Sequence, residues 1–127
     1  MASAATSSDA VGASFKDSKS LDERTEESSK IRAKFPDRVP VICERAPSAK
    51  DSVPMISKTK YLVPEDMTMG QFLYIVRKRI KLPPEQAVFV FVDGRLPQTS
   101  ATLADLYRKH RDADGFLYAT YSGENTF

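Results

Sequence analysis

The 127-residue sequence has little of what secreted, membrane-spanning or disulfide-bonded proteins require. Its one cysteine cannot form a disulfide within the chain, which fits a reducing compartment. No apolar run approaches the roughly 18 residues that a membrane-spanning helix needs. The first 20 residues are rich in alanine and serine but lack the apolar block of a signal peptide. We therefore expect one domain, preceded by a mobile tail.

Residues that carry catalytic chemistry are equally sparse. The single histidine, His110, lies in a charged segment. A catalytic base needs a nucleophile or an acid as a partner, and the sequence shows none, so a solvated histidine at a helix end is the better interpretation. Cys43 falls on the core face of an expected strand, as a small buried hydrophobe would. Asp112 and Asp114 form a loop pair without a partner acid. No Cys/His spacing suits a metal, and no glycine-rich loop suits a phosphate. The sequence predicts no enzyme.

The charge balance also excludes a function class. Nineteen basic and seventeen acidic side chains leave a net charge of +2, which is too balanced for a dedicated nucleic-acid binder. The basic cluster Arg77–Lys81 has no aromatic platform beside it. A solvated helix end that interacts favourably with the helix dipole is the preferred interpretation, and a nucleic-acid contact is the weaker alternative.

What the sequence does have is a wide apolar surface over residues 58–84. Lys58–Val63 alternates as a strand does, and neither of its faces is wholly polar. Thr68 and Gln71 then form a capping box that starts a helix. Its apolar arc of about 160° exceeds the roughly 100° that a surface helix needs. The arc contains Met69, Phe72, Leu73, Ile75, Val76 and Ile80. Its surplus flank, Phe72 and Ile75, indicates either a groove for another chain or packing beneath a loop.

The segment before this region predicts a helix followed by a strand. A capping box at Ser20 and Glu23 opens a sparse surface helix over 21–35, continuous or broken near 25–28. Strand 38–45 is apolar on both faces, with Val39, Val41 and Cys43 on one and Pro40 and Ile42 on the other. A second layer must cover the Pro40 face, and helix 21–35 is the nearest candidate. Pro40 itself favours an edge or strand-start position.

The sequence after the central helix predicts three more strands and one short helix. We expect a strand over 87–92, a hairpin turn at Asp93-Gly94 and a short return strand over 95–97. A helix over 102–110 and a last strand over 116–121 should follow. This order is that of the β-grasp, or ubiquitin-like, fold. We predict an α+β fold, a four-stranded mixed sheet with a central helix. Its parts are a disordered tail (1–20), a helical segment (21–37) and the ubiquitin-like domain (38–127).

Three long blocks resemble the autophagy-related ubiquitin-like modifiers, the group that includes the GABA-receptor-associated proteins. The blocks are KIRAKFPDRVPVICERAP, KTKYLVPEDMTMGQFLYIVRKRIKLPPEQAVFVFV and DGFLYATYSGENTF. The resemblance implies processing by a cysteine protease, and conjugation through a C-terminal glycine to phosphatidylethanolamine by activating and conjugating enzymes. It implies a cytoplasmic protein, bound to autophagosome membranes when lipidated, that recruits cargo receptors and autophagy machinery. These partners carry acidic aromatic-x-x-aliphatic motifs, and no cofactor is expected.

Carried over residue by residue, the resemblance also implies two adjacent peptide-binding pockets. The aromatic pocket would comprise Glu27, Ile31, Pro40, Ile42, Lys60, Leu62 and Phe116. The aliphatic pocket would comprise Tyr61, Val63, Pro64, Met67, Phe72 and Ile75. Arg38, Lys58 and Arg79 would meet acidic side chains of the peptide. The peptide backbone would pair with Lys60–Leu62 as an added strand, and Pro40 would then lie in an inner strand.

The sequence departs from the family pattern in three places. It stops at Phe127, the aromatic residue for protease recognition, where the family has glycine next; a truncated chain is favoured over an unconjugated member. The connection Ala46–Ser57 is longer than usual, and Leu21 replaces a frequent aromatic residue. An alternative function is a soluble adaptor or cytoskeletal linker that acts through the charged helix Asp22–Arg38.

Overall fold

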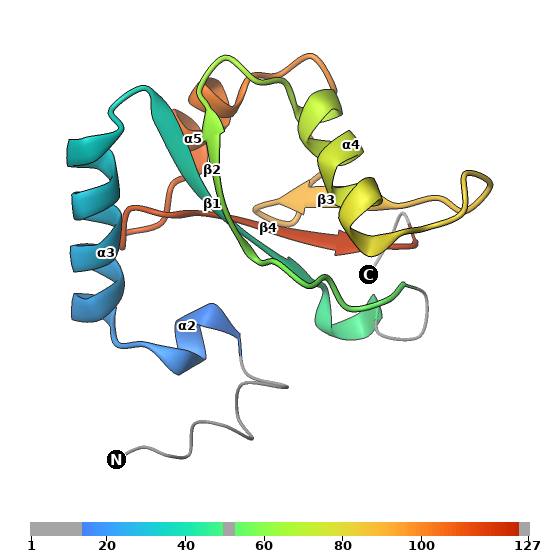
Figure 1. Cartoon of the computed structure of the whole chain (residues 1–127), viewed down its shortest axis with the longest axis horizontal. Coiled ribbons are helices and arrows are strands. Elements are labelled where there is room, and N and C mark those ends of the chain that lie inside the picture. The colour runs from blue at the N-terminus through green and yellow to red at the C-terminus, as the bar shows by residue number, and fades with distance from the viewer. Residues whose placement is uncertain (1–13, 50–52, 125–127) are drawn as a thin grey trace.

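A computed structural model describes residues 14–49 and 53–124, and it shows one mixed sheet with the strand order β2-β1-β4-β3 (Figure 1). The strands are β1 (Arg38–Arg45), β2 (Lys60–Pro64), β3 (Phe89–Val92) and β4 (Leu117–Ser122). β1 pairs with β2 in antiparallel and with β4 in parallel orientation, and β3 pairs with β4 in antiparallel orientation. This confirms the predicted α+β class with a four-stranded mixed sheet.

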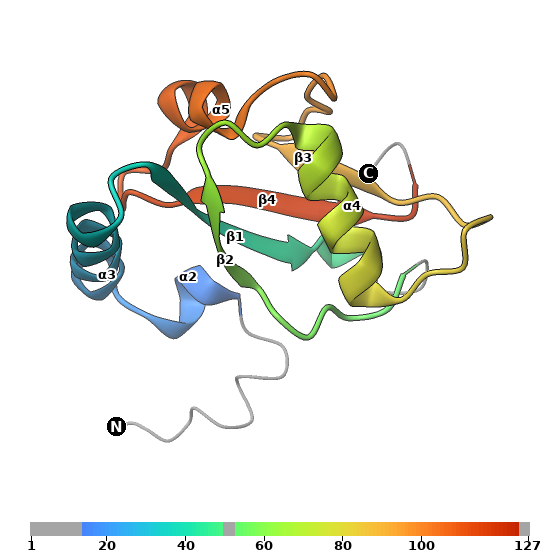
Figure 2. The same ribbon diagram turned by 45° about the horizontal axis from the view of Figure 1, so that its top comes forward.

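Helices lie on both sides of this sheet, as Figures 1 and 2 show. They are α2 (Phe15–Ser18), α3 (Leu21–Lys34), α4 (Met69–Ile80) and α5 (Leu103–His110), with a 3₁₀ turn, η1 (Pro47–Ala49), after β1. α2 and α3 lie on one side of the sheet and α4 on the other. None of the helices in the described part of the chain is long and apolar enough to cross a membrane.

Both predicted capping boxes are present. The hydroxyl of Ser20 accepts a hydrogen bond from the Glu23 amide, and the Glu23 carboxylate accepts one from the Ser20 amide. Thr68 and Gln71 exchange the same pair of bonds at the start of α4. α3 is one continuous helix, so the alternative of two short helices is wrong.

The two apolar faces of β1 are both buried, as predicted. Val39, Val41 and Cys43 belong to the main core, which the buried face of α4 also contributes to. Pro40 and Ile42 point to the opposite side, where α3 contacts β1. The interpretation of Pro40 as an edge residue is wrong, because β1 lies between β2 and β4.

Strands β2, β3 and β4 begin one or two residues later than predicted, and two larger differences also appear. The return strand expected over 95–97 is only a single bridge between Val92 and Arg95, around a turn in which Asp93 and Gly94 have φ values of 56° and 74°. At the other end, α2 and its N-cap Ser14 lie within the tail that was expected to be disordered, so ordered structure begins earlier than expected. Residues 1–13 of that tail lie outside the described residues.

Candidate functional site

The candidate site is built around β2, which is an edge strand of the sheet. Its residues alternate between the two faces. Lys60 and Leu62 lie opposite Ile42 and Pro40 of β1, on the side that α3 covers. Tyr61 and Val63 belong to the core on the α4 side. The outer backbone edge of β2 therefore lies between two differently lined faces, one beneath α3 and one beneath α4.

On the α3 side, the structure brings the predicted aromatic-pocket residues together. Pro40, Ile42 and Phe116 are fully buried and form the base of this region. Ile31 of α3 and Leu62 of β2 are half-buried, so each keeps part of its side chain accessible. Two partly accessible apolar side chains thus lie beside three buried ones on the side of the sheet that α3 covers.

Lysines surround Glu27 at one end of this region. The Glu27 carboxylate accepts hydrogen bonds from Lys19, at 2.9 Å, and from Lys60. Partial burial opposes ionisation of Glu27, but these two ammonium groups outweigh it and hold its pKa below the usual range. The contact ties α3 to β2, so an ion pair joins two residues of the predicted aromatic pocket.

Phe15 of α2 adds a wall that the sequence did not predict. Its ring meets Phe116 edge to face, with centroids 5.2 Å apart and planes at 75°, and the ammonium of Lys60 lies 5.4 Å from its centroid. The Phe15 amide donates to the carboxylate of Glu44 on β1 at 2.8 Å. Burial raises the pKa of Glu44, and this hydrogen bond partly opposes the rise. α2 thus packs against two residues of the predicted pocket, Lys60 and Phe116.

We expect Phe15→Ala to release α2 while the rest of the fold is retained. The substitution removes the ring contact with Phe116, so the free energy of unfolding should fall by only about 1 kcal/mol. Amide hydrogen exchange within α2 should become much faster. Leu21→Ala, which truncates an exposed side chain next to α2, is the control and should leave that exchange unchanged. Unchanged protection of the α2 amides in Phe15→Ala would contradict this role.

On the α4 side, the structure separates core residues from accessible ones. Phe72 is 0% exposed and meets Tyr61 edge to face at 5.5 Å, so the view of Phe72 as surplus surface is wrong. Tyr61 and Val63 are also buried, and burial raises the pKa of Tyr61 to about 12. Three aliphatic-pocket residues remain accessible and line one groove of about 760 Å³: Pro64, Met67 and Ile75.

The predicted basic rim is exposed, as binding to acidic side chains requires. Arg38, Lys58 and Arg79 form no ion pair with any residue in the described ranges. The Lys58 ammonium lies 5.3 Å from the centroid of the Tyr61 ring. The neighbouring Arg77 instead donates to the carbonyl of Pro83 at 3.1 Å. This hydrogen bond joins the basic cluster 77–81 to the loop that follows α4.

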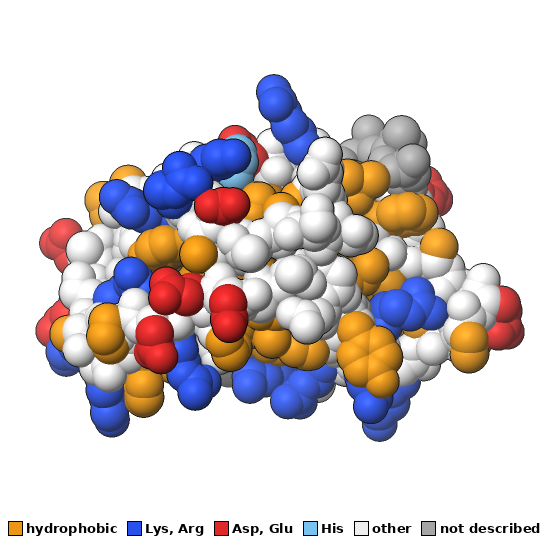
Figure 3. Space-filling view, turned by 90° about the horizontal axis from the view of Figure 1, so that it is seen from above, with side chains coloured by type: hydrophobic (Ala, Val, Ile, Leu, Met, Phe, Trp, Pro, Cys, Tyr) orange, Lys and Arg blue, Asp and Glu red, His pale blue; other side chains and the backbone are white. Residues whose placement is uncertain are grey.

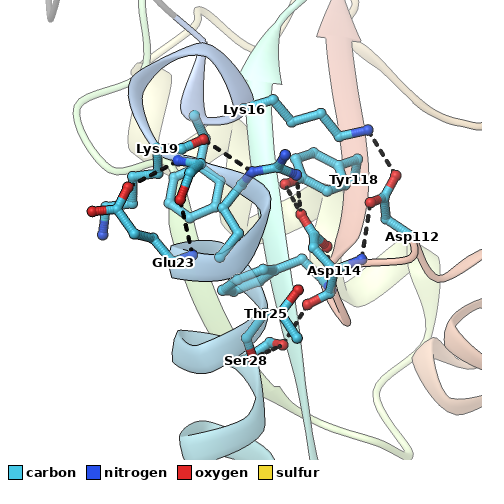
Figure 4. Close-up of polar contacts among 12 residues, drawn as sticks. Lys16, Lys19, Glu23, Thr25, Ser28, Asp112, Asp114 and Tyr118 are labelled. Atoms are coloured by element: carbon cyan, nitrogen blue, oxygen red, sulfur yellow. Dashed lines mark hydrogen bonds and ion pairs between the residues drawn. The ribbon is translucent and has the colours of Figure 1, made fainter.

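A buried ionic cluster fixes α3 in place, and sequence reasoning missed it (Figure 4). Asp114 is fully buried and accepts hydrogen bonds from Arg24 of α3 at 2.6 Å, from the Tyr118 hydroxyl at 2.5 Å and from the Phe116 amide at 2.8 Å. The Ser28 hydroxyl donates to the Asp114 carbonyl at 2.5 Å. Because α3 carries Glu27 and Ile31, this cluster positions two residues of the predicted aromatic pocket.

Cys43 and His110, the residues considered for catalysis, lie in a buried strand and at the end of a helix. Cys43 is completely buried, and burial raises the pKa of its thiol to about 12, so it stays protonated at neutral pH. His110 lies at the end of α5 with its Nδ1 atom 3.3 Å from the Asp93 carboxylate. Within residues 14–49 and 53–124, no group of three His, Cys, Asp or Glu side chains could hold a metal ion.

Comparison with known proteins gives consistent matches. The family model described as "Autophagy protein Atg8 ubiquitin like" matches residues 23–127. The chain is 60% identical to autophagy-related protein 8a of Arabidopsis thaliana over 90% of this chain and 92% of that protein. It is 56% identical to autophagy-related protein 8 of Schizosaccharomyces pombe over 89% and 92% of the two chains. The crystal structure of Trypanosoma brucei ATG8 superimposes with a TM-score of 0.81 at 42% identity, over 89% of this chain and 96% of that one.

Proposed function

This chain belongs to the Atg8 family of autophagy-related ubiquitin-like proteins, and we propose that it recruits partners by binding acidic aromatic-x-x-aliphatic peptides along the edge of β2. It is a ubiquitin-like protein and not an enzyme. Its partners would be cargo receptors and autophagy proteins that carry this motif. Conjugation to phosphatidylethanolamine, after a cysteine protease exposes a C-terminal glycine, would bring it from the cytoplasm to autophagosome membranes; Phe127 lies outside the described residues.

The observation that carries the proposal is the alternation of β2 between two apolar regions. Side chains on a strand alternate between faces, so residues three positions apart point to opposite faces. An aromatic-x-x-aliphatic peptide added to β2 would therefore place its aromatic side chain on the α3 side, beside Ile31 and Leu62. Its aliphatic side chain would lie on the α4 side, against Met67 and Ile75. The spacing of the motif thus matches the two faces of the sheet.

The positions of the two pockets also set the direction of the peptide. The proposed aromatic pocket includes Lys60 and Leu62 of β2, whereas the groove that Met67 and Ile75 line reaches Pro64 at the end of the strand. A peptide that meets the aromatic pocket first must run parallel to β2. Acidic residues before the aromatic one would then meet Lys58, next to the start of β2, where charge complementarity raises the association rate.

Leu62→Ala is expected to weaken binding of such a peptide by about 1–4 kcal/mol, because it removes the accessible apolar wall of the aromatic pocket. Ile75→Ala should weaken binding within the same range through the other pocket. Isothermal titration calorimetry with an acidic peptide containing Trp-x-x-Leu measures both effects. Leu96→Ala, which truncates an exposed leucine outside both pockets, is the matched control and should bind normally. Wild-type affinity in both Leu62→Ala and Ile75→Ala would reject the proposal.

A further inference from the structure

Two arginines lie against one tyrosine ring where α3 and α5 end. The guanidinium carbon of Arg32, on the last turn of α3, is 5.0 Å from the centroid of the Tyr107 ring, and that of Arg111 is 5.7 Å from it. Tyr107 belongs to α5, and Arg111 is the C-cap of that helix. In Figure 3, lysine and arginine side chains lie beside the single histidine, which marks the end of α5. Positive charge therefore gathers at this end of the molecule.

Hydrogen bonds hold this arrangement in place. Tyr107 is 9% exposed, and its hydroxyl donates to the Gly115 carbonyl at 2.6 Å, which fixes the ring. Arg32 is half-buried, and its guanidinium donates to the Arg38 carbonyl at 2.6 Å. A guanidinium has several N–H donors, so this bond leaves donors of Arg32 for a further acceptor. The Arg111 amide donates to the Tyr107 carbonyl at 3.0 Å, whereas the Arg111 side chain is exposed.

Neither arginine has a counter-ion among the residues that the structure describes. The carboxylates of α5 and of the loop after it are paired with other cations: Asp105 with Arg108, Asp112 with Lys16 and Asp114 with Arg24. Two guanidinium groups against one ring repel each other when no anion neutralises them. An anion that binds both groups would remove this repulsion, so the pair is suited to a ligand of negative charge.

We infer that Arg32 and Arg111 bind the phosphate group of a phosphorylated side chain in a partner protein. Guanidinium groups match phosphate oxygens in bidentate geometry. A phosphate monoester carries a charge of about −1.5 to −2 at neutral pH, close in size to the charge of the two cations, whereas a carboxylate carries half of that or little more. The inference is independent of the proposed function, because neither arginine belongs to the two peptide pockets or to the basic rim.

The charges around the two arginines favour a phosphorylated side chain over a membrane surface. Asp37 is exposed directly before Arg38, and Asp105 is exposed on α5. A broad anionic membrane would also bring its negative charge against these carboxylates. A single phosphate on a peptide can approach the two arginines without covering either carboxylate. A phosphorylated segment of a partner protein is therefore the better fit.

Two capped peptides test the inference by NMR titration of the full, isotope-labelled chain. Both have one serine between glycines, and one of them is phosphorylated on that serine. The phosphorylated peptide should bind at least about tenfold more tightly and should shift the side-chain N–H resonances of Arg32 and Arg111. Arg32→Gln and Arg111→Gln should each weaken its binding about fivefold to tenfold. Arg95→Gln, which removes the same charge from another exposed arginine, is the matched control and should bind normally.

Sedimentation with vesicles that contain phosphatidylinositol phosphate tests the membrane alternative. The wild-type protein and Arg111→Gln should sediment equally with them. Vesicle binding that Arg111→Gln abolishes, equal affinity for the two peptides, or equal weakening by Arg95→Gln would overturn the inference. Leu62→Ala should leave phosphopeptide binding unchanged, and Arg111→Gln should leave binding of the Trp-x-x-Leu peptide unchanged, so the inference and the proposed function can fail separately.

Discussion

Asp114→Ala is expected to lower the free energy of unfolding by about 3–5 kcal/mol, because it removes one partner of a buried ion pair. In the native protein the Asp114 carboxylate accepts from Arg24, Tyr118 and the Phe116 amide, and its side chain is 0% exposed. Without it, a guanidinium, a hydroxyl and an amide lose an acceptor that is itself fully buried. Urea denaturation followed by circular dichroism measures the change.

Asp112→Asn is the matched control for this prediction, since it alters a second aspartate in the same loop. Asp112 is partly exposed, and it accepts from Lys16 at 2.7 Å and from the Asp114 amide at 3.1 Å. An asparagine oxygen can still accept from that amide, so the loss should stay below about 1 kcal/mol. Equal losses in the two variants would show that burial of the Asp114 cluster contributes no special stability.

Phe72→Ala is expected to lower the free energy of unfolding by about 3–5 kcal/mol through the cavity it leaves in the core. The ring is 0% exposed and packs edge to face on Tyr61, so the surrounding side chains cannot close the space without moving the sheet or α4. Any loss of peptide binding in this variant would then report damage to the fold. Thermal and urea unfolding, measured without peptide, distinguish a loss of stability from a loss of direct peptide contacts.

Ile75→Ala is the natural comparison on the same helix. Ile75 is only half-buried and lines the open groove, so its truncation should lower stability by about 1 kcal/mol. We expect Ile75→Ala to remain folded and to lose peptide binding, whereas Phe72→Ala loses stability first. A Phe72→Ala protein as stable as the wild type would mean that Phe72 is not part of the core.

The fold could be predicted because its local signals agree with its tertiary structure. The capping boxes at Ser20 and Thr68 mark the true starts of α3 and α4. Alternation along β1 predicted two buried faces, and both are covered. The return strand was predicted wrongly because a segment of three residues that ends in Pro97 offers few donors for a ladder, and only a single bridge forms.

The site was harder to predict because its details depend on contacts between distant segments. A helical wheel gives the direction of Phe72 but not its depth, so the sequence leaves open whether its ring faces a groove or packs inside, and the structure buries it. The ion pair of Arg24 with Asp114 joins residues 90 positions apart, and neither has a local pattern that points to the other. Phe15 is a single aromatic residue in a segment without periodicity. No sequence rule therefore predicted that α2 packs against Phe116.

The outermost strand of the sheet also bears on how the protein avoids self-association. An unpaired strand edge can template pairing with another copy and so lead to aggregation. β2 is only five residues long, it begins at Lys60 and ends at Pro64, and proline has no amide hydrogen to continue a ladder. The short length of the strand and the missing amide donor at Pro64 limit the backbone hydrogen bonds that a second copy could form along this edge. The same features that leave β2 free for a peptide thus discourage a second copy of the chain from taking its place.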